Sequence, residues 1–350
     1  MNRTIFVSGL FALLLASCHT LTNTQASVVR KFATASKEAT GLPFTAMANF
    51  YEVEFKANQL DPENYVIHDS GKEDYDELAE NAMQKIEGIR KDYYDRLRTA
   101  NEVKLTYDLL QAYVSSLEKL ADDRFSRDFE KKSTELGNRM NGLVTRINGG
   151  PQKKMQLGFN PGQWLSSLVT AYGRSRLKAR QAGFLREYLT RADTLVQAIV
   201  SNYHDLQAPY LRGSLNETLK NLRGQFKQSI APYLQYFNRH PDSTTTIVAM
   251  EFYSRIIPVY YELTDEIRKN LVLVDKTDAL LLNMASTHGM MKTMFSARNN
   301  WVSVLEEVNS LRDQLAVVGT LFEKEKNNKP ASTKTLLFQN EDLFKALVDP

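Results

Sequence analysis

Cysteine is almost absent from this chain: one residue in 350, so no internal disulfide bond can form. Exported domains that depend on disulfides carry their cysteines in pairs. An excess of charge is also missing, because 44 lysine and arginine residues stand against 41 aspartate and glutamate residues. A net charge of +3 provides no strong basic field, so we expect no nucleic-acid partner.

The chain also lacks the motifs of common catalytic and metal sites. Its five histidines are His19, His68, His204, His240 and His288. None has another histidine four residues away or an acidic residue three residues away, which excludes the HExxH zinc pattern and the ExxH di-iron pattern. Nucleophile elbows and glycine-rich phosphate loops are missing as well. We therefore expect no cofactor, no metal and no enzymatic activity.

Patterns typical of β-strands are equally scarce, whereas helical periodicity runs through most of the chain. No proline occurs between Pro62 and Pro151, and apolar residues there recur at steps of three and four, as at Ile86, Ile89 and Tyr93. Such steps place apolar side chains on one stripe of a helix. The sequence therefore predicts an all-α fold.

The breaks in the helical periodicity predict three long helical arms, over about 73–148, 161–237 and 243–326. The segments between the arms are short and rich in proline, glycine and asparagine, as in NGGPQKKMQLGFNPG and NRHPDSTTT. Short connections make consecutive helices antiparallel neighbours. We expect an elongated antiparallel helical bundle, or coiled-coil-like rod, of three arms.

Irregularities are expected inside each arm. The first arm is predicted to break near Asp122 and Asp123 or near Gly137. Pro209 should end or kink the second arm, and Pro258 should bend the third, because proline removes a backbone donor and crowds the preceding turn.

The N-terminus has the features of an export signal. Arg3 provides a weakly positive start, and Ile5–Leu15 supply about eleven mostly apolar residues. A membrane-spanning helix needs about 20 such residues, so this segment is too short to stay in the bilayer. The sequence Leu15-Ala16-Ser17-Cys18 that follows resembles the lipobox of bacterial lipoproteins. The alternative is an ordinary secretory signal with a cysteine placed there by chance.

The resemblance to bacterial lipoproteins implies that residues 1–17 are removed and that Cys18 carries a diacylglycerol, usually with a further acyl chain such as palmitate on the new amino group. The low cysteine content fits, because lipid would consume the only thiol. His19 follows Cys18 where an aspartate marks inner-membrane retention in enteric lipoproteins, which favours the outer membrane. We expect a lipid-anchored location in the bacterial cell envelope.

The predicted organisation has four parts. A signal peptide occupies 1–17, a lipidated solvated tether with room for a helical turn near Val28–Ala39 occupies 18–42, and a helical bundle domain occupies 43–326. A charged linker with a short C-terminal amphipathic helix completes the chain over 327–350.

Three groups of residues are candidates for binding. A basic run could face lipid phosphates, an anionic envelope polymer or an acidic partner, or could pair with the acidic segment 71–80. Its members are Arg174, Arg176, Lys178, Arg180 and Arg186. A methionine group could line an apolar groove or fill the core. Its members are Met284, Met290, Met291 and Met294. A tail helix with Leu343, Phe344 and Leu347 on its apolar face could dock on a partner or fold back on the bundle.

The leading functional hypothesis is a non-enzymatic envelope lipoprotein that acts as a scaffold or binding protein for another envelope component. A lipid or small-molecule carrier with a pocket between helices is the alternative. A membrane-inserting, toxin-like helical protein is the third. The charges of Asp275, Lys276 and Asp278 speak against it, because they interrupt the most apolar helical stretch, LVLVDKTDALLLNM.

Overall fold

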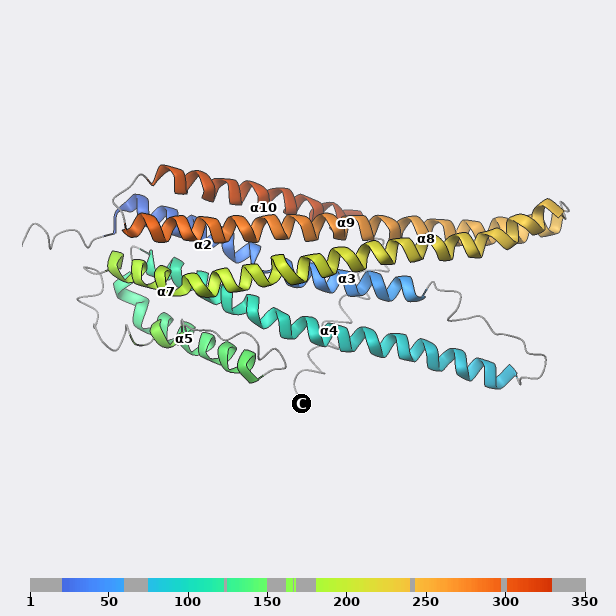
Figure 1. Cartoon of the computed structure of the whole chain (residues 1–350), viewed down its shortest axis with the longest axis horizontal. Coiled ribbons are helices and arrows are strands. Elements are labelled where there is room, and N and C mark those ends of the chain that lie inside the picture. The colour runs from blue at the N-terminus through green and yellow to red at the C-terminus, as the bar shows by residue number, and fades with distance from the viewer. Residues whose placement is uncertain are drawn as a thin grey trace, which may run out of the picture.

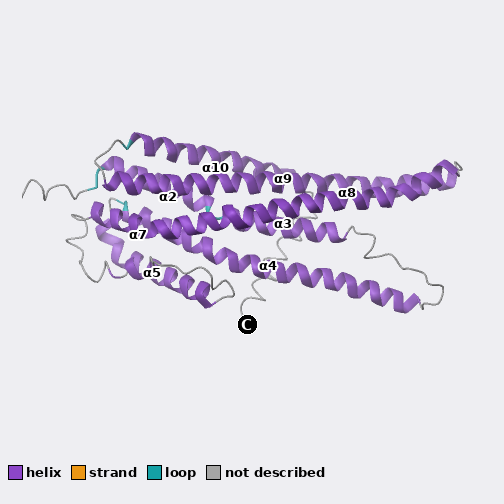
Figure 2. Cartoon of the chain, in the orientation of Figure 1, coloured by secondary structure: helices purple, strands orange, loops and turns teal. Residues whose placement is uncertain are grey.

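The structure is a computed structural model that describes residues 21–59, 75–122, 125–149, 162–165, 167, 181–239, 243–296 and 301–328. All regular structure in these ranges is helical, which confirms the all-α prediction (Figure 2). The principal elements are α2 (Asn23–Ala39), α3 (Leu42–Gln59), α4 (Tyr75–Leu120), α5 (Phe125–Gly149), α7 (Gln181–Asn202), the π-helical segment η3 (Tyr203–Gln207), α8 (Ala208–Arg239), α9 (Ser243–Ser296) and α10 (Val302–Asn328).

The helices lie side by side along the long axis of the molecule (Figure 1). Helices α4 and α9 run in one direction, and α2, α3, α7, α8 and α10 run in the other. Helix α9 has 54 residues, about 81 Å at a rise of about 1.5 Å per residue. It packs against α2, α3, α7, α8 and α10, whereas α4 packs against α2, α3, α5 and α7.

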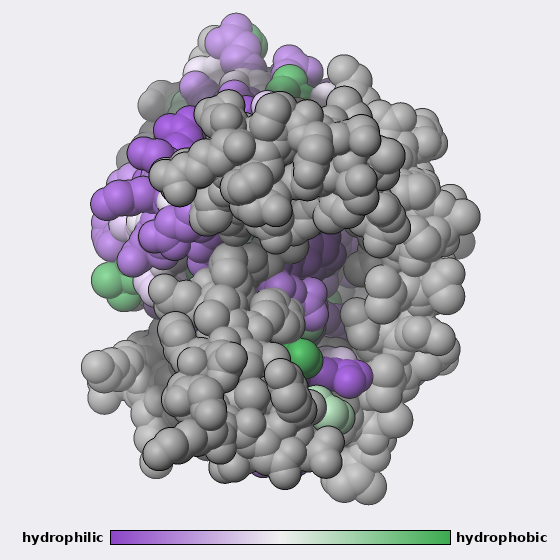
Figure 3. Space-filling view, turned by 90° about the vertical axis from the view of Figure 1, so that its right-hand side faces the viewer, coloured by the Kyte–Doolittle hydropathy of each residue, from purple (hydrophilic) through white to green (hydrophobic). Residues whose placement is uncertain are grey.

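One continuous apolar core runs through the described helices. Aromatic side chains supply much of its volume, and Tyr107, Tyr113, Tyr188, Tyr203 and Phe32 are among the largest that are fully buried. Viewed from the end that faces right in Figure 1, the described residues that reach the surface are mostly hydrophilic, with isolated apolar ones (Figure 3). This distribution is typical of a helical body whose apolar faces cover one another.

Helix α2 is part of this core, and the prediction of a solvated tether over 18–42 is wrong from residue 23 onward. Thr22 caps α2 through a capping box, in which Thr22 Oγ1 accepts from the Gln25 N–H (3.2 Å) and Gln25 Oε1 accepts from the Thr22 N–H (3.0 Å). Val29 and Phe32 are 0% and 1% exposed. The helix packs against α4, α9 and α10. Its buried face consists largely of alanine and serine, with Val28, Val29 and Phe32 as the larger apolar residues, which explains why composition suggested a tether.

The predicted first and third arms each contain two helices. The first is interrupted between Leu120 and Phe125, which agrees with the break expected near Asp122 and Asp123. The third is divided into α9 and α10, and α10 runs back along α9 and also covers α2 (Figure 1). The sequence pattern did not predict this reversal.

The second arm does not end at Pro209. The chain stays helical from α7 through η3 into α8, because a wider turn precedes the proline. In η3 the Ala208 N–H donates to the Tyr203 carbonyl, five residues back, as in a π-helix. Pro258 likewise lies inside α9, which continues on both sides of it.

Substitutions on α2 test whether its burial stabilises the fold. Phe32→Ala should lower the free energy of unfolding by about 3–5 kcal/mol, because it leaves a cavity in a packed core. The matched change Thr34→Ala, at an exposed position two residues away, should cost less than about 0.5 kcal/mol. Urea unfolding followed by circular dichroism measures both values. A loss at Phe32 as small as that at Thr34 would support a tether instead.

Candidate functional site

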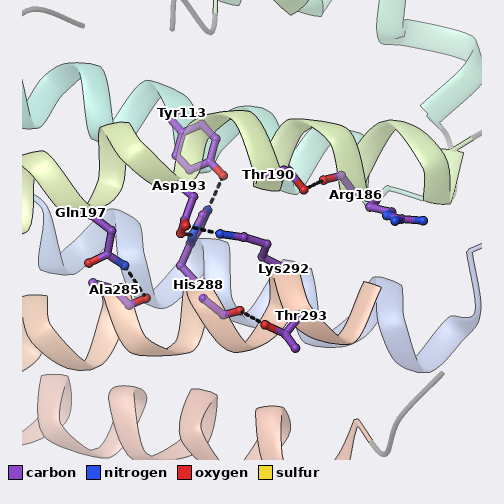
Figure 4. Close-up of polar contacts among 10 residues, drawn as sticks. Tyr113, Arg186, Thr190, Asp193, Gln197, Ala285, His288, Lys292 and Thr293 are labelled. Atoms are coloured by element: carbon purple, nitrogen blue, oxygen red, sulfur yellow. Dashed lines mark hydrogen bonds and ion pairs between the residues drawn. The ribbon is translucent and has the colours of Figure 1, made fainter. Parts of the chain in front are cut away.

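A partly buried polar cluster joins the C-terminal parts of α4 and α9 to the middle of α7, and we call it the His288 cluster after its central residue (Figure 4). Its members are Tyr113 on α4, Asp193 on α7, and His288 and Lys292 on α9. The His288 side chain is 0% exposed. Its Nδ1 lies 3.2 Å from Asp193 Oδ1, and its Nε2 lies 2.7 Å from the Tyr113 hydroxyl. The Lys292 ammonium donates to the other Asp193 oxygen.

The surroundings of His288 determine its protonation state. Burial lowers the pKa of His288, and the hydrogen bond to the Asp193 carboxylate only partly opposes that effect. The ring is therefore neutral, with Nδ1–H donating to Asp193 and Nε2 accepting from the Tyr113 hydroxyl. Hydrogen bonds from His288 and Lys292 lower the pKa of Asp193 to about 2, so its carboxylate stays charged.

Aromatic residues enclose the cluster. Tyr113 and Tyr188 lie with ring centroids 5.1 Å apart, and Tyr188 stacks on Trp164 at 4.7 Å. The Tyr188 hydroxyl lies 2.6 Å from Ser116 Oγ. The Ser116 hydroxyl donates to the backbone carbonyl of Tyr113 (2.5 Å). These polar side chains between α4, α7 and α9 thus all have hydrogen-bond partners within the three helices.

The cluster has the order of groups found in a proton relay: a carboxylate orients an imidazole, which faces a hydroxyl. Two observations argue against such chemistry here. Burial raises the pKa of Tyr113 well above its ordinary value, so the phenol keeps its proton. The imidazole is inaccessible, and the two grooves described below are lined by other residues. The arrangement favours a structural role, in which directional hydrogen bonds set the axial register of α4, α7 and α9.

A second polar cluster lies where η3 meets α8, and we call it the Arg212 cluster. Arg212 donates through Nη2 to Asp278 Oδ2 (2.6 Å) and through Nε to Asp275 Oδ1 (2.5 Å). His204 Nδ1 lies 2.9 Å from Asp278 Oδ1. The Asp278 side chain is only 8% exposed, so one of the charges in the apolar stretch of α9 points inward to partners on η3 and α8.

Two surface grooves lie between described helices. The larger, of about 800 Å³, separates α2 from α10 and is lined by Thr34, Ala35, Glu38, Asn309, Arg312, Asp313, Leu315, Ala316, Gly319 and Thr320. The smaller, of about 270 Å³, lies between α3 and α8 and includes Glu54, Asn58, Glu217 and Gln225. Both carry mixed polar and small side chains instead of an apolar lining.

The candidate surfaces predicted from sequence lie partly outside the described residues. Of the basic run, Arg174, Arg176, Lys178 and Arg180 lie outside them, as do Cys18 and the tail residues Leu343, Phe344 and Leu347. Arg186 is exposed near the start of α7. That part of α7 lies beside the C-terminal end of α4, where the Gln181 side chain donates to the Leu120 carbonyl (2.6 Å).

The acidic segment 71–80 extends into the opposite end of α4, as Figure 1 shows. Pairing between Arg186 and the described part of that segment, 75–80, is therefore wrong, because most of the 46-residue length of α4, about 69 Å in all, separates them.

Two of the four candidate methionines lie in the core, and the other two are partly exposed. Met284 and Met291 are fully buried, whereas Met290 and Met294 are partly buried and pack against the core. None of the four lines either groove.

Sequence reasoning missed the two clusters because their partners are distant along the chain. Asp193 and His288 are 95 residues apart, and a search for acidic residues within one helical turn of each histidine cannot find such a pair. A usable signal did exist. His288 and Lys292 are four residues apart on the face of α9 that also carries the buried Met284 and Met291. Polar residues on an apolar stripe need partners from another helix.

Comparisons with family models, with curated proteins and with solved structures yield no significant match. Among the described residues, no helix is both long and apolar enough to cross a membrane. The same residues contain no group of three histidine, cysteine, aspartate or glutamate side chains placed to hold a metal ion.

The neutral state of buried His288 predicts how stability depends on pH. Below about pH 6.5 the unfolded chain takes up a proton on this histidine, whereas the folded chain does not, so the free energy of unfolding falls as the pH falls. The free energy of unfolding of the wild type should therefore change with pH between about pH 6.5 and 5. In His288→Gln this pH dependence should be weaker by up to about 1.4 kcal/mol per pH unit.

Phe32→Leu is the control for this measurement, because it loosens the same core without removing a titrating group. Its unfolding profile should run parallel to that of the wild type. Parallel profiles for His288→Gln and the wild type would show that His288 is not a buried neutral group.

Removal of Asp193 tests whether the His288 cluster stabilises the fold. Asp193→Ala leaves a buried imidazole N–H without its acceptor, which should cost about 2–4 kcal/mol of unfolding free energy. Asp265→Ala removes an exposed carboxylate that pairs with Arg268 on the same helix, and it should cost less than about 0.5 kcal/mol. Equal losses from the two variants, measured by urea unfolding, would contradict the assigned role of Asp193.

Proposed function

We propose that the protein is a lipid-anchored bacterial envelope protein that acts as a non-enzymatic scaffold or binding protein for another envelope component. The observation that carries this proposal is the lipobox-type sequence Leu15-Ala16-Ser17-Cys18, which holds the only cysteine of the chain. Two or more acyl chains on Cys18 would make a stable membrane anchor. The outer membrane is the favoured location, because His19 replaces the aspartate that would signal inner-membrane retention.

The body is suited to a binding role. Its described helices form an elongated bundle, in which α9 alone is about 81 Å long. Long flanks of this kind offer extended surfaces to another envelope protein or to an anionic envelope polymer. The two polar clusters hold the bundle in register through hydrogen bonds inside it. A rigid bundle keeps binding residues on different helices at fixed spacing.

A carrier of a small polar molecule is the second candidate, and the α2–α10 groove favours it. Its volume of about 800 Å³ is within the range of ligand sites. Its mixed polar lining suits a polar molecule better than a lipid tail. Native mass spectrometry of protein purified from its own cells separates the two candidates, because a carrier should retain a ligand.

Insertion of a helical hairpin into a membrane is less well supported. The α9 stretch with the strongest apolar character carries Asp278, whose carboxylate is held by Arg212 and His204. Insertion of this stretch would break both contacts and bury a charge in lipid, which is costly.

Substitution of Cys18 tests the anchor. In cells, the wild-type protein should sediment with the membrane fraction, and Cys18→Ser should move nearly all of it to the soluble fraction, because no acyl chain can be attached. Ser17→Ala is the matched control, since alanine keeps a small residue before the cysteine, and it should remain with the membranes. Membrane retention of Cys18→Ser in the same amount as the wild type would contradict the proposal.

A further inference from the structure

We infer that one end of the molecule, rather than a flank, lies against the lipid bilayer. This end is formed by the start of α2, the end of α9 and the start of α10, which lie together in Figure 1. The inference rests on the proposed lipid attachment at Cys18. It adds which surface faces the membrane and how far the remaining helices reach from it.

The short distance along the chain between the anchor and α2 carries the inference. Thr22 is the N-cap of α2, and four residue steps separate it from Cys18. Even a fully extended chain spans at most about 3.6 Å per residue, so these steps cover about 14 Å. Because Thr22 caps α2 and Ala26, Val28 and Val29 are buried, α2 cannot unwind as far as these residues to lengthen the tether without loss of core packing. The lipid would therefore hold the folded body close to the headgroups.

The same end carries side chains that suit a membrane interface. Trp301 precedes α10, is partly buried, and packs edge-on against Phe295 at the end of α9 (ring centroids 4.8 Å apart). Val302 beside it is 54% exposed. Leu21, immediately before the N-cap of α2, is also partly buried. Tryptophan is enriched at the level of lipid headgroups, where its ring meets apolar chains and its N–H meets water.

Exposed large apolar side chains also occur along the flanks of the described helices, such as Leu206, Tyr210 and Tyr261, so apolar exposure alone does not separate the end from the flanks. Their exposed charges include pairs of opposite sign within one helix, such as Arg98–Asp95 on α4, Arg191–Glu187 on α7 and Arg268–Asp265 on α9. Paired charges produce no field of one sign that would draw a flank to anionic lipid. The orientation is therefore set by the lipid on Cys18, which is attached next to the end of the molecule where α2 begins.

The helices then project from the membrane. The end of α8 and the start of α9 lie at the opposite end of the molecule (Figure 1). Glu262, an exposed residue of α9, lies 34 residues before Ser296, about 51 Å along the helix. A position on the first turn of α2 and one at Glu262 should therefore differ strongly in their distance from lipid.

Energy transfer to the bilayer measures this difference. The full protein is purified from cells and reconstituted on vesicles of phosphatidylethanolamine and phosphatidylglycerol that contain a small fraction of acceptor-labelled headgroups. A donor dye is attached to a cysteine introduced at an exposed site, either Thr24→Cys on α2 or Glu262→Cys on α9. Because Cys18 is the only natural cysteine, the introduced thiol is labelled alone when Cys18 carries lipid.

We expect several-fold more energy transfer from position 24 than from position 262. Equal and strong transfer from both positions would show that a flank lies on the bilayer, and weak transfer from both would show that the body stands off it. Either result, for protein that floats with the vesicles, overturns the inference and leaves the lipid anchor intact.

Failure of the anchor itself is recognised separately. Wild-type protein should float with the vesicles and take up no thiol-reactive dye. If the wild type fails to float, or if Cys18 is labelled, the proposed attachment is wrong and the inferred orientation fails with it.

Discussion

The burial of α9 is the constraint on which the rest of the structure depends. A helix of 54 residues can be stable in water only if other helices cover its apolar surface, and five described helices pack against it. This requirement explains why α10 folds back along α9 and why the N-terminal helix α2 is drawn into the core. It also explains the two polar clusters. Asp278 and His288 face inward from α9 and obtain partners from α7, η3 and α8 across the interface.

Helix content could be predicted from sequence because it depends on local periodicity. The spacing of apolar residues identified the helical class, and the acidic pair Asp122–Asp123 marked the break between α4 and α5. The capping box of Thr22 and Gln25 was an available signal for α2, but small and polar residues around Val29 and Phe32 concealed it. Local patterns of this kind define where helices begin and end. They do not define which helices become neighbours.

The features that sequence reasoning missed all depend on contacts between distant segments. The partnership of Asp193 with His288 joins residues 95 positions apart, and the reversal of α10 onto α9 requires a partner surface that includes α2. Pro209 was expected to end or kink its helix. Instead, the π-helical turn of η3 moves the hydrogen-bonding pattern by one residue just before the proline, so the chain continues as α8. This turn lies against the core, where Tyr203 is fully buried.

The proposed protein consists of a lipid anchor at Cys18 and a long helical body. The body contributes length, rigid register and a core that extends to within a few residues of Cys18. The most direct test of the account is the intact mass of the protein extracted from its own cells. The account predicts a chain that begins at Cys18 and carries the added mass of a diacylglycerol, with or without a further acyl chain. A chain that retains residues 1–17, or one that carries an unmodified Cys18, would contradict it.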